Sequence, residues 1–219
     1  MTGTATDQAH TVTIAQSGLQ GILGLPPDPK GIVLFAHGSG SGRLSPRNNQ
    51  VAAGLREAGV ATLLFDLLTE EEAADRAKVF DIDLLARRLV LATDWLDERD
   101  DTRHLPVGYF GASTGAAAAL VASTLSARPI AAIVSRGGRP DLAGAALRKV
   151  RAPTLLIVGG ADPVVLELNR EALQALTSEK EIAVVPGAGH LFEEPGALDT
   201  VIELARRWFV LHLKGPPPR

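Results

Sequence analysis

The sequence has no cysteine among its 219 residues, and this absence excludes several kinds of chemistry. Disulfides, thiolate metal sites and a cysteine nucleophile are all ruled out. The formal net charge is −3, so the chain lacks the basic character expected of a protein that binds nucleic acid or an anionic membrane. No apolar run approaches the roughly 20 residues that cross a bilayer. We therefore expect a small molecule as partner, and neither nucleic acid nor membrane.

The first ten residues, MTGTATDQAH, contain neither a basic region nor an apolar run. They predict no signal peptide, and we expect a cytoplasmic protein. A chain of this length with 46% hydrophobic residues suits one domain with a sizeable core. We predict a single domain over residues 1–219, with a flexible tail at 214–219. No feature of the pattern indicates an oligomeric state.

Apolar, β-rich segments alternate with amphipathic helical segments along most of the chain. The alternation predicts an α/β fold of βαβ units with a mostly parallel sheet, and a turn at 17–18 indicates an antiparallel start. The charged segment 69–80 is interpreted as a solvated connector rather than an arch over a site, and 141–150 as a helix. The predicted strands cover 11–16, 19–26, 31–38, 60–68, 107–113, 130–135, 154–160 and 181–187.

The stretch VGYFGASTGAAAAL places Ser113 between two glycines, at the junction of a predicted strand and a predicted helix. In a G-x-S-x-G nucleophile elbow the serine sits in a strained turn, and its neighbours must be small. Gly111 and Gly115 meet that demand. Ser113 would also stand at a helix N-terminus, which favours developing negative charge. The alternative is an ordinary turn in which Ser113 caps the helix.

A serine nucleophile needs a base, and the base needs an orienting acid. His190 follows the last predicted strand on a glycine-flanked loop, and Asp162 follows the strand before it. Asp162 could instead cap the next helix, and Asp141 is a competing acid after the sixth strand. Because ligands bind at the carboxyl ends of parallel strands, we predict the triad Ser113, Asp162 and His190.

This Ser…Asp…His order on an elbow closely resembles the α/β-hydrolase superfamily, from HGSGSGR through GASTG and GGADPVV to GAGH. The compact size resembles the dienelactone-hydrolase-like group, and some stretches resemble small hydrolase domains found fused to phosphoribosyltransferase-like domains. The resemblance implies a doubly wound sheet of about eight strands with helices on both faces and no lid domain. The enzyme that names the group has cysteine at the elbow, whereas this chain has Ser113.

The resemblance further implies a serine hydrolase that forms an acyl-enzyme, with no cofactor and no metal. Ser113 would attack the carbonyl while His190 moves the proton and Asp162 orients the imidazole. The oxyanion hole would use the backbone N–H groups of Thr114 and Ser39, with Gly40 as the alternative to Ser39. His37 is expected to brace that loop.

The segment between the sixth strand and its helix is only about eight residues long, 136–143, which leaves no room for a lid. An open cleft favours small or medium, soluble esters, thioesters or lactones. Arg43 and Arg136 lie beside the predicted site, where a guanidinium could bind a substrate carboxylate or phosphate. Alternatively, each arginine pairs with a loop carboxylate such as Asp141 and holds the turns together.

Two functions of other classes compete with the hydrolase. A binding protein can keep this fold without turnover, although such proteins often lack a member of the triad. A nucleotide-binding domain would need G-x-G-x-x-G after the first strand, or G-x-x-x-x-G-K-[ST], and neither occurs in those positions. The sequence therefore favours the enzyme.

Overall fold

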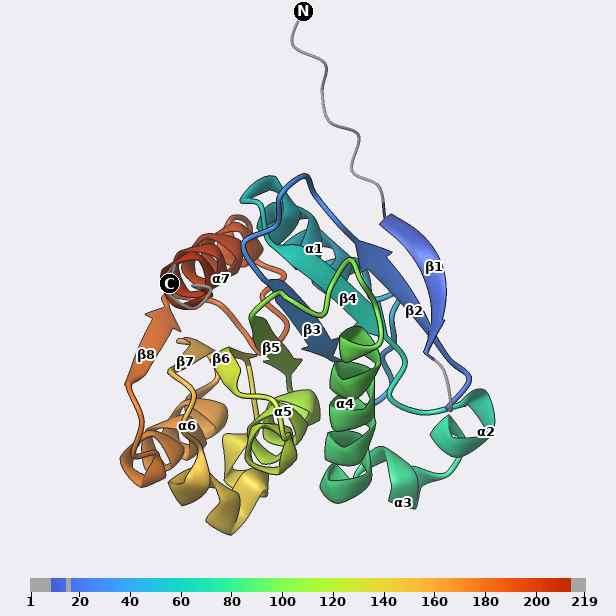
Figure 1. The fold of residues 1–219 in the computed structure, drawn as a ribbon. Coiled ribbons are helices and arrows are strands. Elements are labelled where there is room, and N and C mark those ends of the chain that lie inside the picture. Colours follow the sequence, from blue (N-terminus) through green and yellow to red (C-terminus); the bar gives the residue numbers. More distant parts are fainter. Residues whose placement is uncertain (1–8, 15–16, 214–219) are drawn as a thin grey trace, which may run out of the picture.

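A computed structural model describes residues 9–14 and 17–213, which build one mixed sheet with helices on both faces (Figure 1). The strand order is β1-β2-β4-β3-β5-β6-β7-β8. Strand β2 pairs antiparallel with both β1 and β4, and every other pair is parallel. The predicted antiparallel start and parallel remainder are confirmed. The strands are β1 (Ala9–Ile14), β2 (Leu19–Gly24), β3 (Ile32–Ala36), β4 (Ala61–Phe65), β5 (Val107–Ala112), β6 (Ile130–Arg136), β7 (Thr154–Gly159) and β8 (Lys180–Val185).

The helices form two layers because the buried strands β3 to β7 are apolar on both faces. Two helices cover one face and pack on each other, α1 (Pro46–Glu57) and α7 (Ala197–His212). The other face lies under α4 (Ile82–Asp97), α5 (Thr114–Leu125), the 3₁₀ segment η1 (Pro140–Lys149) and α6 (Pro163–Ala175) (Figure 1). Parts of the predicted first strand (15–16) and the predicted tail (214–219) lie outside the described residues.

Helix α4 shows why the apolar pattern predicted its position well. Its apolar stripe, Leu85, Leu89, Ala92 and Leu96, is buried against the sheet. Asp81 caps the first turn by accepting a hydrogen bond from the Leu84 N–H. A stripe at helical spacing therefore marked the face that packs on the core.

The charged segment 69–80 has no buried residue, as predicted for a solvated connector, but it is also ordered. It folds into two single-turn helices, α2 (Glu70–Ala73) and α3 (Arg76–Val79). The side chain of Glu72 accepts from the Thr69 N–H at 3.0 Å and from Arg88 of α4 at 2.8 Å. Both bonds hold the pKa of Glu72 below its usual range, and the bond from the Thr69 backbone is the larger cause. The segment is therefore anchored to the rest of the domain.

The helix predicted over 141–150 is present in the segment after β6, and its type is one that the sequence did not specify. It is a 3₁₀ helix, η1, and Gly144 inside it has φ 51 and ψ −128. These angles lie outside the helical region, so the helix is interrupted at this residue. Helical spacing of apolar residues predicted a helix but could not distinguish its type.

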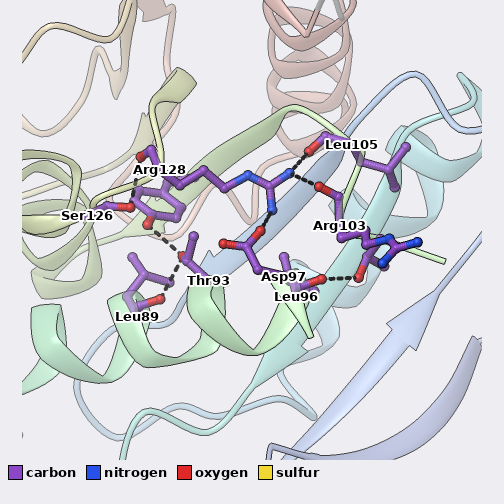
Figure 2. A network of polar contacts seen from close by, with 10 residues as sticks. Leu89, Thr93, Leu96, Asp97, Arg103, Leu105, Ser126 and Arg128 are labelled. Atoms are coloured by element: carbon purple, nitrogen blue, oxygen red, sulfur yellow. Dashed lines mark hydrogen bonds and ion pairs between the residues drawn. The ribbon is translucent and has the colours of Figure 1, made fainter. Parts of the chain in front are cut away.

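A polar network joins the C-terminal half of α4 to β5 and to the segments that lead into β5 and β6 (Figure 2). Arg128 forms an ion pair with Asp97 and donates to the carbonyl of Leu105, just before β5. Within the same network, the hydroxyls of Thr93 and Tyr109 lie 2.7 Å apart. Burial raises the pKa of the Tyr109 phenol, which therefore stays protonated. The network anchors β5, whose other end carries Ser113.

Candidate active site

Ser113 lies between β5 and α5 in a backbone conformation with φ 51 and ψ −123. Such a positive φ is strained for a residue with a side chain. The glycines on either side are needed for space. A Cβ at Gly115 would lie 2.1 Å from the carbonyl oxygen of Ala36, and a Cβ at Gly111 would lie 2.4 Å from the Cα of Ala116. The side chain of Ser113 makes no capping hydrogen bond to α5, so it does not act as the helix cap.

His190 and Asp162 are brought together by the loops that follow β8 and β7. The Nδ1 atom of His190 lies 3.0 Å from Oδ2 of Asp162. The other carboxylate oxygen of Asp162 accepts from the Val165 N–H at 3.4 Å, at the start of α6. Asp162 therefore combines the two roles considered for it, the acid facing the histidine and the helix cap.

Asp141, the competing acid, is engaged elsewhere. Its two carboxylate oxygens accept from Nε and Nη2 of Arg139 at 2.9 and 2.7 Å. In this bidentate ion pair both carboxylate oxygens of Asp141 face Arg139 rather than a histidine. The structure thus pairs His190 with Asp162 and Asp141 with Arg139.

The His190 loop approaches the backbone just after β6, and a hydrogen bond within the loop closes it. Gly137 has φ +51, and a Cβ there would lie 2.9 Å from the carbonyl oxygen of His190. Glu194 accepts a hydrogen bond from the Gly189 N–H at 2.9 Å. The N–H of Ser113 donates to the carbonyl of Arg136, the residue before Gly137, at 3.4 Å. Sequence reasoning did not single out Glu194, because its partner is a backbone group.

The loop after β3 lies directly against the elbow. A Cβ at Gly38 would be 2.9 Å from the Cβ of Ser113. The N–H of Ser39, a predicted oxyanion donor, donates to the hydroxyl of Thr114 at 3.1 Å. The N–H of Thr114 belongs to the first residue of α5, where no intrahelical acceptor exists. Both predicted donors therefore lie beside Ser113, and the Thr114 hydroxyl is a contact that the sequence did not reveal.

His37 holds this loop to the end of β4. Its Nδ1 lies 3.0 Å from the carbonyl oxygen of Gly38, and its Nε2 accepts from the Leu67 N–H at 3.0 Å. An imidazole that donates through Nδ1 and accepts through Nε2 is neutral. Burial lowers the pKa of His37, which favours the same neutral form. The geometry agrees with a brace.

The two arginines proposed to bind substrate have different surroundings. Arg43 forms an ion pair with Asp66, and its N–H donates to the same carboxylate at 2.8 Å. Arg136 is only 8% exposed, and its Nε and Nη1 atoms are buried without a hydrogen-bond partner. Burial is the main cause that lowers the pKa of Arg136 to about 10, and the nearby charge of Arg47 adds to it. Arg43 is thus paired with a carboxylate, as expected for an arginine that holds the turns together, whereas Arg136 has no such partner in the described residues.

A cavity of about 560 Å³ adjoins the site. On one side its wall is formed by the loop after β3, with His37 and Ser39, and by the Arg43–Asp66 pair. On the other side it is formed by segment 69–80, with Thr69 and Val79, and by residues 18–20 at the start of β2. Ser113 and His190 are not among its walls, so the cavity begins at the loop beside the nucleophile.

Within residues 9–14 and 17–213, no three histidine, cysteine, aspartate or glutamate side chains gather in a way that could hold a metal ion. In the same ranges, no helix has both the length and the apolar character to cross a membrane.

Comparisons with known proteins show what the chain is similar to. The family model described as "Dienelactone hydrolase family" matches residues 19–206. A crystal structure of a dienelactone hydrolase from Anabaena variabilis is 55% identical, covers 95% of this chain and 99% of its own, and has a TM-score of 0.90. Est1E from Butyrivibrio proteoclasticus shares the fold at 16% identity, with a TM-score of 0.77 over 93% of this chain and 98% of its own.

A longer relative occurs in Mycobacterium tuberculosis, under the name "Putative phosphoribosyl transferase". It is 58% identical over 212 residues, which are 97% of this chain but 48% of the relative. The chain therefore spans about half the length of this curated relative.

Proposed function

Since the chain belongs to the dienelactone hydrolase family of α/β-hydrolases, we propose that it is a serine hydrolase acting on an ester-type bond. One observation carries the proposal. Ser113 occupies a strained elbow with an uncommitted side chain, and an oriented His190–Asp162 pair stands on the loops after β8 and β7, at the same edge of the sheet. These are the parts that covalent acyl transfer requires.

In the proposed reaction, Ser113 Oγ attacks the acyl carbonyl while His190 Nε2 takes its proton. The leaving group then departs with that proton, and the acyl group stays on Ser113. His190 then takes a proton from water, which attacks the acyl-enzyme; the carboxylic acid leaves and Ser113 Oγ recovers its proton from His190. Asp162 holds the Nδ1–H of His190 and stabilises the imidazolium.

The oxyanion of each tetrahedral intermediate would be stabilised by the N–H groups of Thr114 and Ser39. Because the Ser39 N–H donates to the Thr114 hydroxyl in the free protein, that bond must be exchanged when the oxyanion forms.

The proposed substrate is a small or medium, soluble ester, thioester or lactone. Only residues 137–139 separate β6 from η1, so no lid is inserted at the carboxyl end of β6. The adjoining cavity of about 560 Å³ would accept one side of such a substrate. The phosphoribosyl transferase name belongs to a protein of about twice this length, and the proposal does not depend on it.

The test is labelling with a fluorophosphonate probe, which reacts with an activated serine. We expect one covalent adduct, mapped by mass spectrometry to Ser113, and none in Ser113→Ala. A panel of ester, thioester and lactone substrates then identifies the bond. Absence of both labelling and turnover would favour a binding protein on the same fold.

A further inference from the structure

The cavity of about 560 Å³ lies to one side of the nucleophile. Its walls include residues of β2, of the loop after β3 and of the segment after β4. These strands lie on one side of β5 in the sheet, and β7 and β8, whose loops carry Asp162 and His190, lie on the other. The wall residue Gly38 stands beside the nucleophile, because a Cβ there would be 3.7 Å from Oγ of Ser113. The cavity therefore adjoins Ser113 on the side away from His190.

The position of His190 decides which part of an ester can reach this cavity. In acyl transfer the histidine gives its proton to the leaving group, which must therefore lie next to Nε2 of His190. In the proposed mechanism the carbonyl oxygen faces the N–H groups of Ser39 and Thr114. The remaining substituent of the reacting carbon is the acyl chain. The space left for it lies on the side of Gly38, where the cavity begins.

Part of the cavity wall is aliphatic. Leu19 of β2, Leu68 after β4 and Leu85 of α4 line the cavity and are buried in the core on the α4 side of the sheet. Val79 of segment 69–80 adds a fourth aliphatic side chain, which packs against the same core. A hydrocarbon chain that enters the cavity would leave water, and this favours binding by about fourfold for each buried methylene group.

Several polar side chains of the wall are already bonded within the protein. Gln20 donates at 3.2 Å to a hydroxyl of β1 and at 3.2 Å to a carbonyl of the turn before β2. The hydroxyl of Thr69 accepts from an N–H of α2 at 3.2 Å. Among the charged side chains of the wall, Arg43 and Asp66 form an ion pair, and Glu70 is a carboxylate. The cavity therefore suits a neutral apolar group better than an anion.

Segment 69–80 forms a fixed part of the wall. Arg88 of α4 donates to Glu72 at 2.8 Å, and a capping box between Thr69 and Glu72 holds the first turn of the segment. A wall that is fixed before the ligand binds gives the cavity a set size. Its volume of about 560 Å³ lies within the range of about 300–1,000 Å³ that is usual for small-molecule pockets. This size suits a chain of medium length.

From this arrangement we propose that the cavity is the acyl pocket and that the substrate carries a neutral, medium-chain aliphatic acyl group. The inference rests on the proposed function and deepens it, since it names the class of acyl group. Segment 69–80 and Leu85 limit the length of the chain that the pocket accepts.

Two isomeric esters test which part of the substrate enters the cavity. Methyl octanoate carries its chain on the acyl side, and heptyl acetate carries it on the leaving-group side. Methyl butyrate and propyl acetate are the matched short esters. In a pH-stat assay of the wild type, we expect kcat/KM to rise by about twentyfold or more from methyl butyrate to methyl octanoate, and by less than about threefold from propyl acetate to heptyl acetate. A larger rise on the leaving-group side would overturn the assignment.

Ala73→Trp tests the cavity itself. Ala73 lines the cavity but is exposed, so an indole can be added there without disturbing the core. We expect kcat/KM to fall by about tenfold or more for methyl octanoate and by less than about twofold for methyl butyrate. Ala74→Trp is the matched control, because Ala74 is exposed on the same segment and is not among the walls, and it should leave both values unchanged. Equal effects on the two esters in Ala73→Trp, or the same selective loss in Ala74→Trp, would contradict the proposal.

Direct binding separates this proposal from the proposed function. Titration calorimetry on Ser113→Ala with octanoate and butyrate needs no turnover, and the two acids differ only in chain length. We expect octanoate to bind more tightly by about tenfold or more, and the difference to be lost when Ala73→Trp is added. If octanoate binds in this way but the wild type hydrolyses no ester, the hydrolase proposal fails and the pocket for an aliphatic chain stands. Equal affinities for the two acids, or no binding of octanoate, would overturn the pocket.

Discussion

The Nδ1 atom of His190 lies 3.0 Å from Oδ2 of Asp162, while both oxygens of Asp141 are held by Arg139. The two aspartates follow neighbouring strands, and sequence order alone leaves both as candidates for the acid. The contact with His190 separates them and leads to the first prediction.

Asp162→Asn should lower kcat strongly, because an asparagine cannot stabilise the imidazolium and favours the wrong tautomer of His190. The loss in a trypsin-like triad is roughly 10⁴-fold, and we expect a comparable order of magnitude. Asp141→Asn is the matched control and should keep kcat within a factor of about two. Steady-state hydrolysis of a 4-nitrophenyl ester measures both. A larger loss in Asp141→Asn would contradict the assignment of the acid.

The strained backbone of Ser113 predicts which of two inactive variants is the more stable. Ser113→Ala and Ser113→Gly should both abolish turnover. Glycine adopts a positive φ without steric cost, so Ser113→Gly should relieve strain that Ser113→Ala keeps, by about 1 kcal/mol. Urea unfolding of both variants measures the difference. Equal midpoints would show that the elbow is not strained, and residual turnover in either variant would exclude Ser113 as the nucleophile.

Neutral His37 predicts that stability decreases on acidification. Its pKa is lowered in the folded protein, so the unfolded chain binds a proton first as the pH falls through its ordinary value near 6.5. The contribution of His37 is therefore complete above pH 6.5. It is lost below that pH, by at most about 1.4 kcal/mol per pH unit, until the folded pKa is reached.

The measurement is the free energy of unfolding of wild type and His37→Gln between pH 8 and pH 5. The slope below pH 6.5 should be smaller in His37→Gln, because one protonation site has been removed. His104→Gln is the control, because His104 is exposed and should leave the slope closer to that of the wild type. An unchanged slope in His37→Gln would mean that the loop does not depend on the neutral imidazole.

Loss of the Arg43–Asp66 ion pair should lower stability without changing the preference between neutral and anionic esters. Arg43→Met removes a partly exposed ion pair while the backbone bond to Asp66 is kept, so the expected cost is about 1 kcal/mol. Because the pair supports the loop that carries Ser39, kcat/KM should fall by a similar factor for neutral and anionic esters. Thermal unfolding measures the first effect, and hydrolysis of 4-nitrophenyl butyrate and 4-nitrophenyl hemisuccinate, a neutral and an anionic ester of similar length, measures the second. A selective loss on the anionic ester would instead show that Arg43 contacts the substrate.

The sequence predicted the parts of the site that depend on chain order. Ser113, Asp162 and His190 each follow a strand, and parallel strands bring their carboxyl ends to one edge, so their placement at one edge of the sheet followed from the alternation of elements. It also predicted the apolar stripe of α4, since burial follows helical spacing.

Other features depend on contacts between distant segments and had no local signal. Arg43 and Arg136 look equivalent in the sequence. Arg43 pairs with Asp66, which lies 23 positions later in the sequence, and Arg136 meets no carboxylate in the described residues. The bond between Ser39 and Thr114 joins residues 75 positions apart. The order of segment 69–80 likewise depends on Arg88 of a later helix.

The close approach of Gly115 to Ala36 means that the elbow is positioned by backbone against backbone, and the serine side chain caps no helix. The fold of the elbow therefore does not depend on the reactive atom of residue 113. A change of one codon, by evolution or by design, could replace the serine oxygen with a cysteine sulfur without a change in the backbone around it.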